Sequence, residues 1–368
     1  MSMNGTVAKG IERILIIRLS AIGDVVRTLP AVHALREGFP KAHISWVVEE
    51  KGRDILLHQP EVDEIILFHR KRWGKGLLNP LTFVRTVREV YWFCKELRAK
   101  HYDICLDFHG LLKSGLISYL SGARERVGFA REYCKDFNYL FNNRRIRLRS
   151  RRLSRFERNL ALIRSLGLEG GREEVVFNVS KEDIEYVDEF FQIHGLEKSG
   201  PLVAIHQATS PNTPYKQWPP ARYGKLADRL MEELGVSVLF TWGPGERSAV
   251  DEIRAQMQRN SLVAPETHSL KQLGEIFRRC SLYIGGDTGP MHIASLVKTP
   301  VVGIFGPTDP VMNAPYEGTP YIMVRKDIPC SPCRNYQCEH VECMNAVTTQ
   351  DVFEAVKSLL ERTGSLCK

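Results

Sequence analysis

Residues 282–292 read LYIGGDTGPMH: a short apolar run, two glycines, an acid, a threonine and a glycine, and then a proline at the start of a helical pattern. A buried strand followed directly by a helix is the beginning of a β-α unit of a parallel sheet. The glycines allow a ligand close to the backbone, and a helix start presents unpaired N–H groups. The loop is therefore either a diphosphate cradle that includes Thr288, or a tight turn in which Asp287 or Thr288 only caps the helix.

The same alternation of β-branched runs and helical patterns extends over most of the chain. Parallel strands need crossover helices, so this alternation predicts an α/β protein with a parallel sheet in each half. We predict strands at 13–18, 44–48, 64–68 and 103–108 in the first half, and at 202–206, 237–242, 282–285 and 300–305 in the second.

The length predicts two domains. The chain has 368 residues, whereas one hydrophobic core rarely organises more than roughly 250–300. The polar stretch 169–198 is the expected junction. With 43% hydrophobic and 26% charged residues, the composition excludes a disordered chain, a collagen and a coiled coil. No run of about 18–20 apolar residues occurs, and residues 1–9 lack the apolar core of a signal peptide, so we expect a soluble, cytoplasmic protein.

Charge is divided unevenly between the halves. Residues 1–180 carry 32 Lys and Arg against 20 Asp and Glu, and the remainder carries 19 against 23. The basic half therefore suits an anionic partner such as nucleic acid, a membrane surface or a phosphorylated substrate. Eight arginines between Arg144 and Arg158, and the cluster Arg70-Lys71-Arg72-Trp73, form either solvated faces or contacts to lipid headgroups or a phosphorylated acceptor. Nucleic acid is disfavoured, because no recognition motif accompanies the charge.

Three further loops carry candidate chemistry after predicted strands. Asp24, in Ser20-Ala21-Ile22-Gly23-Asp24, is either a helix-start carboxylate or a catalytic one. One glycine in this loop excludes a dinucleotide fingerprint, and no Walker A motif occurs. Lys216 follows the hydroxyls of Thr209 and Ser210, which suits phosphate oxygens or a solvated loop. Glu246 either binds a ribose diol or caps a helix.

Together and in this order, these loops resemble glycosyltransferase family 9, the heptosyltransferases of lipopolysaccharide core assembly. The resemblance covers about residues 13–356. It implies a GT-B architecture, with two facing Rossmann-like domains, a parallel sheet in each and a cleft between them. Residues 1–180 with the final helix, 349–368, would bind the acceptor, and 181–348 the sugar nucleotide. The motifs that carry it are Ser20–Asp24 with Thr28-Leu29-Pro30, Lys216-Gln217-Trp218-Pro219, Gly286-Asp287-Thr288-Gly289 with His292, and Phe305-Gly306-Pro307-Thr308-Asp309-Pro310.

The resemblance implies an inverting transfer of heptose from ADP-heptose to a lipopolysaccharide inner-core acceptor, with no cofactor required. Asp24 would be the general base, and Lys216 would stabilise the departing diphosphate. A lysine and a helix start aimed at that group stabilise the transition state more than the ground state, so no metal is needed. The remaining donor contacts would be Thr209 and Ser210 to phosphate, Glu246 to ribose, Asp287 to sugar hydroxyls, Thr288 and Gly289 to the diphosphate, and His292.

The expected partners are the nucleotide sugar and an anionic lipid-linked oligosaccharide, with peripheral contact at the cytoplasmic face of the inner membrane and no nucleic acid. His109 stands where the family commonly has Gln; with Lys113 it either lines the acceptor pocket or packs at a strand end. Cys330, Cys333, Cys338 and Cys343 are spaced for zinc or an iron–sulfur cluster, or are free thiols or disulfides. The resemblance implies no catalytic metal there.

Two alternatives stay open. The chain is a family-9 transferase that uses another sugar nucleotide or glycolipid, or it is a catalytically silent binding protein for a membrane surface or nucleic acid on the same fold. Asp24, Lys216 and Asp287 occurring together argue against the silent alternative.

Overall fold

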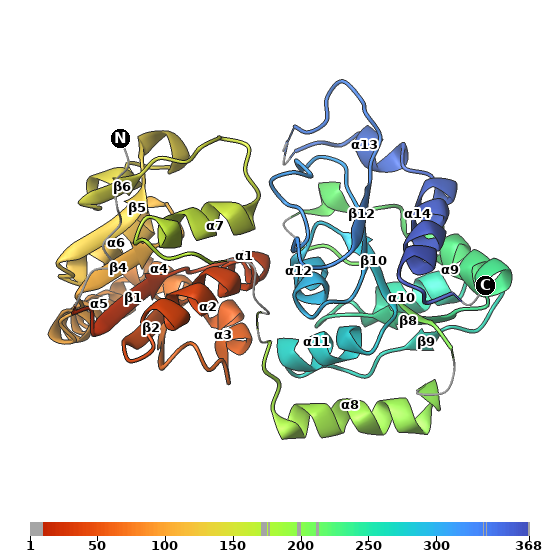
Figure 1. The fold of residues 1–368 in the computed structure, drawn as a ribbon, viewed down its shortest axis with the longest axis horizontal. Helices are drawn as coiled ribbons and strands as arrows, with labels where there is room; N and C mark the ends of the chain where they lie inside the picture. Colours follow the sequence, from red (N-terminus) through yellow and green to blue (C-terminus); the bar gives the residue numbers. More distant parts are fainter. Residues whose placement is uncertain are drawn as a thin grey trace. The chain divides into compact units, whose positions relative to one another are not determined.

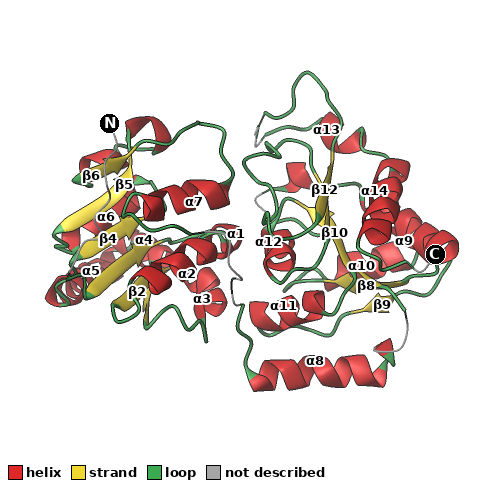
Figure 2. Ribbon diagram, in the orientation of Figure 1, coloured by secondary structure: helices red, strands yellow, loops and turns green. Residues whose placement is uncertain are grey.

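The computed structural model describes residues 10–170, 175, 177–196, 200–210, 213–333, 335 and 337–366. The chain divides into two compact units, unit 1 (Met1–Val176) and unit 2 (Phe177–Lys368). Figure 1 colours unit 1 from red to olive and unit 2 from green to blue. In Figure 2 the strands of each unit are flanked by helices.

Unit 1 contains a six-stranded sheet in which all neighbouring strands are parallel, in the order β3-β2-β1-β4-β5-β6. The strands are β1 (Arg13–Ile17), β2 (His43–Val48), β3 (Glu64–Leu67), β4 (Ile104–Asp107), β5 (Glu125–Phe129) and β6 (Arg144–Ile146). The helices are α1 (Ile22–Val26), α2 (Leu29–Gly38), α3 (Glu50–Leu56), α4 (Arg70–Leu78), α5 (Pro80–Ala99), α6 (Leu112–Leu120) and α7 (Arg155–Arg164), with 3-10 turns η1 (Arg131–Tyr133) and η2 (Asn138–Leu140).

Unit 2 repeats this design with a second parallel sheet, in the order β12-β11-β10-β7-β8-β9. The strands are β7 (Leu202–His206), β8 (Ser237–Thr241), β9 (Leu262–Val263), β10 (Leu282–Gly286), β11 (Val301–Ile304) and β12 (Tyr321–Val324). The helices are α8 (Lys181–Ile193), α9 (Pro220–Leu234), α10 (Arg247–Arg254), α11 (Leu270–Arg278), α12 (Gly289–Leu296), α13 (Glu342–Asn345) and α14 (Thr349–Arg362), with the 3-10 turn η4 (Pro214–Lys216).

Each sheet has one point where the strand order reverses. In unit 1 the reversal lies between β1 and β4, and in unit 2 between β7 and β10. At such a point the loops after the two strands run in opposite directions and leave room for a ligand. The candidate residues Asp24 and His109 follow β1 and β4, and Lys216 and Asp287 follow β7 and β10. Topology alone therefore places Asp24 with His109, and Lys216 with Asp287, whereas Glu246 follows the neighbouring strand β8.

The central strands are buried on both faces, which is why they read as continuous apolar runs. Ile14 to Ile17 of β1 are all 0% exposed. In unit 1, Leu97 of α5 and Ile117 of α6 pack with Leu15 and Ile17 in one cluster, so these two helices cover the same face of the sheet. Among the residues that the structure describes, no helix is long and apolar enough to cross a membrane.

The predicted fold class is confirmed, because both units are α/β with parallel sheets. All eight predicted strands are present, but β5, β6, β9 and β12 are not found by the sequence pattern. Those four are edge or near-edge strands, two to five residues long, and only the last three residues of β5 and Val324 of β12 are buried in them. The predicted junction 169–198 contains α8, which begins after the cap Ser180. The cleft between the domains stays a prediction.

The placement of the last helix differs from the prediction. We assigned residues 349–368 to the first domain, but α14 packs on α9, β11 and β12 of unit 2. Its apolar face, including Val352, Val356 and Leu359, is buried in the unit 2 core. Trp218 adds an anchor, because its Nε1 donates a 2.9 Å hydrogen bond to the carbonyl of Val347, just before the helix.

Candidate functional site

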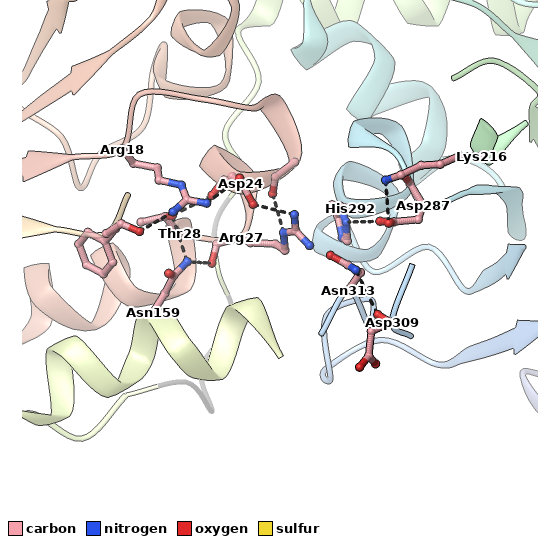
Figure 3. Close-up of polar contacts among 12 residues, drawn as sticks. Arg18, Asp24, Arg27, Thr28, Asn159, Lys216, Asp287, His292, Asp309 and Asn313 are labelled. Atoms are coloured by element: carbon pink, nitrogen blue, oxygen red, sulfur yellow. Dashed lines mark hydrogen bonds and ion pairs between the residues drawn. The ribbon is translucent and has the colours of Figure 1, made fainter. Parts of the chain in front are cut away.

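The Asp24 carboxylate of unit 1 is held by two arginines. Its Oδ2 lies 2.7 Å from Nη2 of Arg18, and its Oδ1 lies 2.7 Å from Nη2 of Arg27. Figure 3 shows the carboxylate between the two guanidinium groups. The side chain of Asp24 stays 25% exposed, whereas those of Arg18 and Arg27 are 6% and 9% exposed. The carboxylate is thus the part of this cluster that solvent, or a ligand, can reach.

Local structure fixes both arginines. Arg18 directly follows β1 and donates through Nη1 to the carbonyl of Phe108, which follows β4, so it bridges the reversal point of the sheet. Arg27 ends the short helix α1 and donates through Nε to the Gly23 carbonyl at 3.1 Å. Asn159 of α7 then donates to the Arg27 carbonyl at 2.9 Å and to the Thr28 hydroxyl at 3.1 Å. The loop is therefore braced from three elements.

These contacts decide the charge of Asp24. Burial favours the protonated form, but Arg18, Arg27 and Arg155 outweigh burial and hold the pKa of the carboxyl well below its usual range. The carboxylate is consequently ionised at neutral pH. The sequence suggested either a helix-start carboxylate or a catalytic one. In the structure Asp24 lies in the first turn of α1 and forms ion pairs with both Arg18 and Arg27. Sequence reasoning missed Arg18 and Arg27, although i,i+3 spacing pointed to Arg27.

His109 and Lys113 follow β4 at the same edge of the sheet. Neither ring nitrogen of His109 has a hydrogen-bond partner among the residues described. Burial, reinforced by Arg18 and Lys113, lowers the pKa of His109 to about 3, so the imidazole is neutral at pH 7. Nζ of Lys113 lies 2.7 Å from Oε1 of Glu49, which also pairs with Arg70 at 2.9 Å.

Asp107 is a further buried acid in this loop, and its role is structural. The carboxylate accepts hydrogen bonds from the backbone N–H groups of His109 and Gly110 at 2.9 and 3.1 Å. It also accepts from Ser114 at 2.9 Å and from the amide of Asn138 at 2.6 Å. Four donors saturate the carboxylate, which is 0% exposed, so Asp107 shapes the loop that carries His109.

In unit 2, Lys216 and Asp287 meet across the reversal point. Nζ of Lys216 lies 3.0 Å from Oδ2 of Asp287 and 3.3 Å from its backbone carbonyl. Nε2 of His292 lies 3.5 Å from the other oxygen, Oδ1. Figure 3 shows the three side chains converging. Asp287 is 8% exposed and His292 1% exposed, so both side chains are largely shielded from water. Charge interactions are stronger in such a buried environment than in water.

The amino end of α12 lies next to this group. Thr288 occupies the N-cap position, but its side chain makes no cap hydrogen bond; the hydroxyl donates to the Gly286 carbonyl at 3.4 Å. Gly289 is the first helical residue, and Pro290 follows it. The first-turn N–H groups therefore have no cap from Thr288, which is the arrangement that suits an anion.

The two hydroxyls that precede Lys216 differ in position. Thr209 donates to Oε1 of Gln217 at 3.1 Å, and the Gln217 amide donates to the Gln207 carbonyl at 3.1 Å. Ser210 is exposed, and its carbonyl accepts the Thr213 N–H at 2.7 Å. Residues 211 and 212 lie outside the described residues. Thr209 is thus tied to the Lys216 loop through its side chain, whereas Ser210 contacts that loop through its carbonyl, which also accepts from the Thr213 hydroxyl at 3.2 Å.

Glu246 turns back onto its own loop. Its Oε2 accepts a 2.7 Å hydrogen bond from the N–H of Gly243 and lies 3.8 Å from Nε2 of His206. Burial raises the pKa of Glu246 above its ordinary value. Burial also lowers the pKa of His206 to about 4, and Nδ1 of His206 lies 3.0 Å from the Thr241 hydroxyl. Glu246 has the helix-start position that the sequence predicted, but it makes no cap hydrogen bond to α10.

The arginine-rich run between Arg144 and Arg158 is not one uniform surface. Arg144 pairs with Glu125 at 2.6 Å, and the guanidinium of Arg158 lies 4.1 Å from the centre of the Phe129 ring. Arg155 acts electrostatically on Asp24. These three therefore have contacts within unit 1, and binding of lipid headgroups or of a phosphorylated acceptor by the run stays a prediction. The exposed members are Arg145, Arg147, Arg149, Arg151 and Arg152.

The late cysteines are free thiols in the described part of the chain. Cys330 and Cys333 are exposed, Cys338 is half-buried and Cys343 is buried. They occupy the segment between β12 and α14, part of which lies outside the described residues. Within the described ranges, no three His, Cys, Asp or Glu side chains are grouped so that they would hold a metal ion. The disulfide alternative has no support among the described cysteines.

Known proteins are similar to this chain in sequence and in fold. The family described as glycosyltransferase family 9 (heptosyltransferase) matches residues 90–343. Lipopolysaccharide heptosyltransferase 1 of Pseudomonas aeruginosa is 27% identical over 341 residues, which are 89% of this chain and 88% of that protein. The solved family-9 glycosyltransferase of Veillonella parvula covers 98% of this chain and 99% of its own, at 24% identity and a TM-score of 0.80. The Escherichia coli heptosyltransferase WaaC with ADP-2-deoxy-2-fluoro heptose covers 95% and 99%, at 23% identity and a TM-score of 0.69.

Proposed function

The chain belongs to glycosyltransferase family 9 and is therefore a glycosyltransferase, and from this premise we propose that it transfers a heptose from ADP-heptose to an inner-core acceptor of lipopolysaccharide. The relatives support this choice of donor and acceptor. The Pseudomonas relative is a lipopolysaccharide heptosyltransferase, and the E. coli structure holds an ADP-linked fluoro heptose. Unit 2 would bind the donor, and the basic unit 1 would bind the acceptor.

The observation that carries the proposal is the contact between Lys216 and Asp287 beside the amino end of α12. It combines the two things that a leaving diphosphate needs, a cation and a set of backbone N–H groups, at the ligand-binding point of a parallel sheet. In the proposal Lys216 and the N–H groups of Thr288 and Gly289 bind the diphosphate. Asp287 holds Lys216 in place and accepts from sugar hydroxyls, with His292 behind it.

The remaining donor contacts follow from the neighbouring loops. Thr209 would turn its hydroxyl from Gln217 to donate to a phosphate oxygen, and Ser210 would extend that contact. Glu246 already accepts the Gly243 N–H through Oε2, so its Oε1 would accept from a ribose hydroxyl. In this proposal no metal is needed to neutralise the diphosphate, because Lys216 and the start of α12 supply positive charge.

The transfer step is a displacement with inversion. An acceptor hydroxyl oxygen forms a bond to the anomeric carbon of the heptose while the bond from that carbon to the diphosphate oxygen breaks, and ADP leaves with the electron pair. Asp24 accepts the proton of the attacking hydroxyl. Its two arginines make the carboxylate a weak base, so we expect the proton to move late, after the new bond has made the hydroxyl strongly acidic.

The acceptor side of the proposal rests on unit 1. His109 is neutral and has unpartnered ring nitrogens among the residues described, so it would bind an acceptor hydroxyl. Lys113 would leave its ion pair with Glu49 and form one with an anionic group of the acceptor. Because such an acceptor is lipid-linked, we propose peripheral attachment at the cytoplasmic face of the inner membrane.

An assay of nucleoside diphosphate release tests the proposal. The enzyme is incubated with ADP-heptose, ADP-glucose, UDP-glucose or GDP-mannose, together with heptose-deficient lipopolysaccharide. We expect acceptor-dependent release from ADP-heptose alone. Release from a different donor but not from ADP-heptose would overturn the donor assignment. Release that is independent of the acceptor would overturn the assignment of lipopolysaccharide.

A further inference from the structure

Exposed apolar side chains are concentrated on one part of unit 1. Thirteen of the fifteen large apolar side chains that are exposed in the described part of the chain lie between Leu77 and Leu140. Only Ile193 and Val311, both in unit 2, lie elsewhere. Single exposed apolar residues are ordinary, but a contiguous group on a water-facing surface marks a contact with something apolar.

Helix α5 carries the centre of this group and lies at the left edge of unit 1 in Figure 1. Leu81 is 93% exposed and Val84 78%. At 100° per residue, these two share one face of the helix with Tyr91 and Trp92, which are 60% and 43% exposed. The opposite face is the one that packs on the sheet, through Leu97 and Phe93. Helix α5 is therefore apolar on both its buried and its exposed side.

The neighbouring elements extend the same surface. Leu77 and Leu78 end α4, directly before α5, and Leu78 is 87% exposed. Helix α6 packs beside α5 on the same face of the sheet and exposes Leu112, Leu116 and Tyr119 at i, i+4 and i+7. The turn η2, which packs on α6, adds Leu140. We define the α5 surface as the exposed side chains of α4, α5, α6 and η2.

Basic side chains accompany the apolar ones. Residues 70–99 contain eight Lys and Arg against two acids, Glu89 and Glu96. Glu89 is already engaged, because it accepts from Arg72, Arg85 and the indole of Trp73. On the exposed face of α5, Arg88 and Lys95 alternate with the apolar residues, and Nζ of Lys95 lies 4.5 Å from the centre of the Trp92 ring. The α5 surface is thus apolar and strongly cationic.

We propose that the α5 surface docks the protein onto an anionic lipid bilayer. Leucine, valine and aromatic side chains would enter the headgroup boundary, while Arg88, Lys95 and the α4 cations meet lipid phosphates. A second copy of the chain fits less well, because two such surfaces would place like charges opposite each other. The inference deepens the proposed function, since a lipid-linked acceptor lies at such a bilayer, but its observations are independent of the transfer reaction.

The inference also relocates the membrane contact. The sequence pointed to the arginines between Arg144 and Arg158, several of which the fold uses internally. That run exposes arginines but no large apolar side chain. Charge alone gives salt-sensitive adsorption, whereas charge with exposed apolar area gives insertion that persists at higher salt. The α5 surface has both properties.

Co-sedimentation of the full chain with vesicles tests the proposal, without donor or acceptor. The vesicles contain phosphatidylcholine and phosphatidylglycerol at 3:1, with pure phosphatidylcholine as the neutral comparison. The apolar variant is Leu81→Glu with Val84→Glu, two changes at highly exposed positions. Its matched control is Ile193→Glu, at a 71% exposed position of unit 2. The charge variant is Arg88→Glu with Lys95→Glu, and its control is Lys225→Glu, an exposed position of α9.

We expect the wild type to partition onto anionic vesicles and each α5 variant to partition at least about tenfold more weakly, with both controls unchanged. Equal loss in Ile193→Glu, or wild-type binding by both α5 variants, would overturn the proposal. So would a wild-type dimer that the apolar variant converts to a monomer while vesicle binding is unaffected. ADP release with a water-soluble, delipidated acceptor should be unchanged in the α5 variants. Vesicle binding therefore tests the docking surface, and ADP release separately tests the proposed function.

Discussion

Lys216 and Asp287 are 71 residues apart in the sequence, yet Nζ of the lysine lies 3.0 Å from Oδ2 of the aspartate. The contact forms because β7 and β10 are neighbours in the sheet, so the loops after their carboxyl ends meet. Asp287 is 8% exposed, and a buried carboxylate needs its counter-ion. The pair therefore orients the lysine before a substrate arrives, at the helix start that the proposed mechanism uses.

Replacing Lys216 with Gln removes the cation but keeps a polar side chain that is one bond shorter. If Lys216 stabilises the departing diphosphate, kcat/KM for the donor should fall by about 100-fold, which is typical of removing one transition-state contact. Steady-state ADP release measures this. Because Asp287 loses its partner, Tm is followed in parallel. Lys326→Gln, which breaks the more exposed pair with Asp351 in the same unit, is the control. Unchanged donor kinetics would remove Lys216 from the mechanism.

Asp24→Asn keeps the shape of the side chain and removes its charge and basicity. We expect turnover to fall by roughly 100- to 10,000-fold while ADP binds as in the wild type, because donor contacts lie in unit 2. Turnover is followed by ADP release and binding by calorimetry. Asp251→Asn, in the exposed pair with Arg247, provides the comparison. A variant with wild-type turnover would contradict the base role, whereas parallel loss of ADP binding would point to a misfolded protein.

The two arginines predict that Asp24 stays ionised in the free enzyme. Arg18 and Arg27 hold its pKa well below the ordinary value of about 3.9, so no protonation should occur down to about pH 4. The titration of the carboxyl carbon in 13C-labelled protein, assigned with Asp24→Asn, measures this directly. In Arg27→Gln one counter-ion is lost, and the midpoint should rise toward the ordinary range. A wild-type midpoint at or above the ordinary value of about 3.9 would show that the ion pairs do not control the charge.

Buried His206 predicts a loss of stability in mild acid. Its pKa is about 4 in the folded state and about 6.5 in the unfolded chain. Below pH 6.5 the unfolded chain therefore binds a proton that the folded protein does not bind. The free energy of unfolding should fall between pH 6.5 and 4, by about 3 kcal/mol at most from this group. Denaturant unfolding across this range tests it. His206→Asn should flatten the dependence, and a change at exposed His194 should not. Equal slopes in His206→Asn and wild type would contradict the assignment.

Local patterns predicted the elements that have many buried, regularly spaced apolar residues. The strand at Leu202–His206 was predicted to the residue, because all five of its positions are buried and the first four are apolar. The edge strand β6 (Arg144–Ile146) was missed, since its residues are two arginines and an isoleucine and only pairing with β5 makes them a strand. The exposed leucines of α4 and α5 were also missed as a surface, because a sequence pattern cannot tell an apolar face that is covered from one that is not.

The same division holds for the candidate sites. The sequence by itself determined the α/β class, the loops that carry Asp24, Lys216 and Asp287, and the family resemblance, because glycines, prolines and strand ends are properties of short stretches. Only the tertiary structure decided which side chains pair: Arg18 with Asp24, Lys216 with Asp287, and the last helix with unit 2 rather than unit 1. Charge pairing and helix docking depend on strand order, and strand order is set by which buried faces fit together, across separations that no local pattern records.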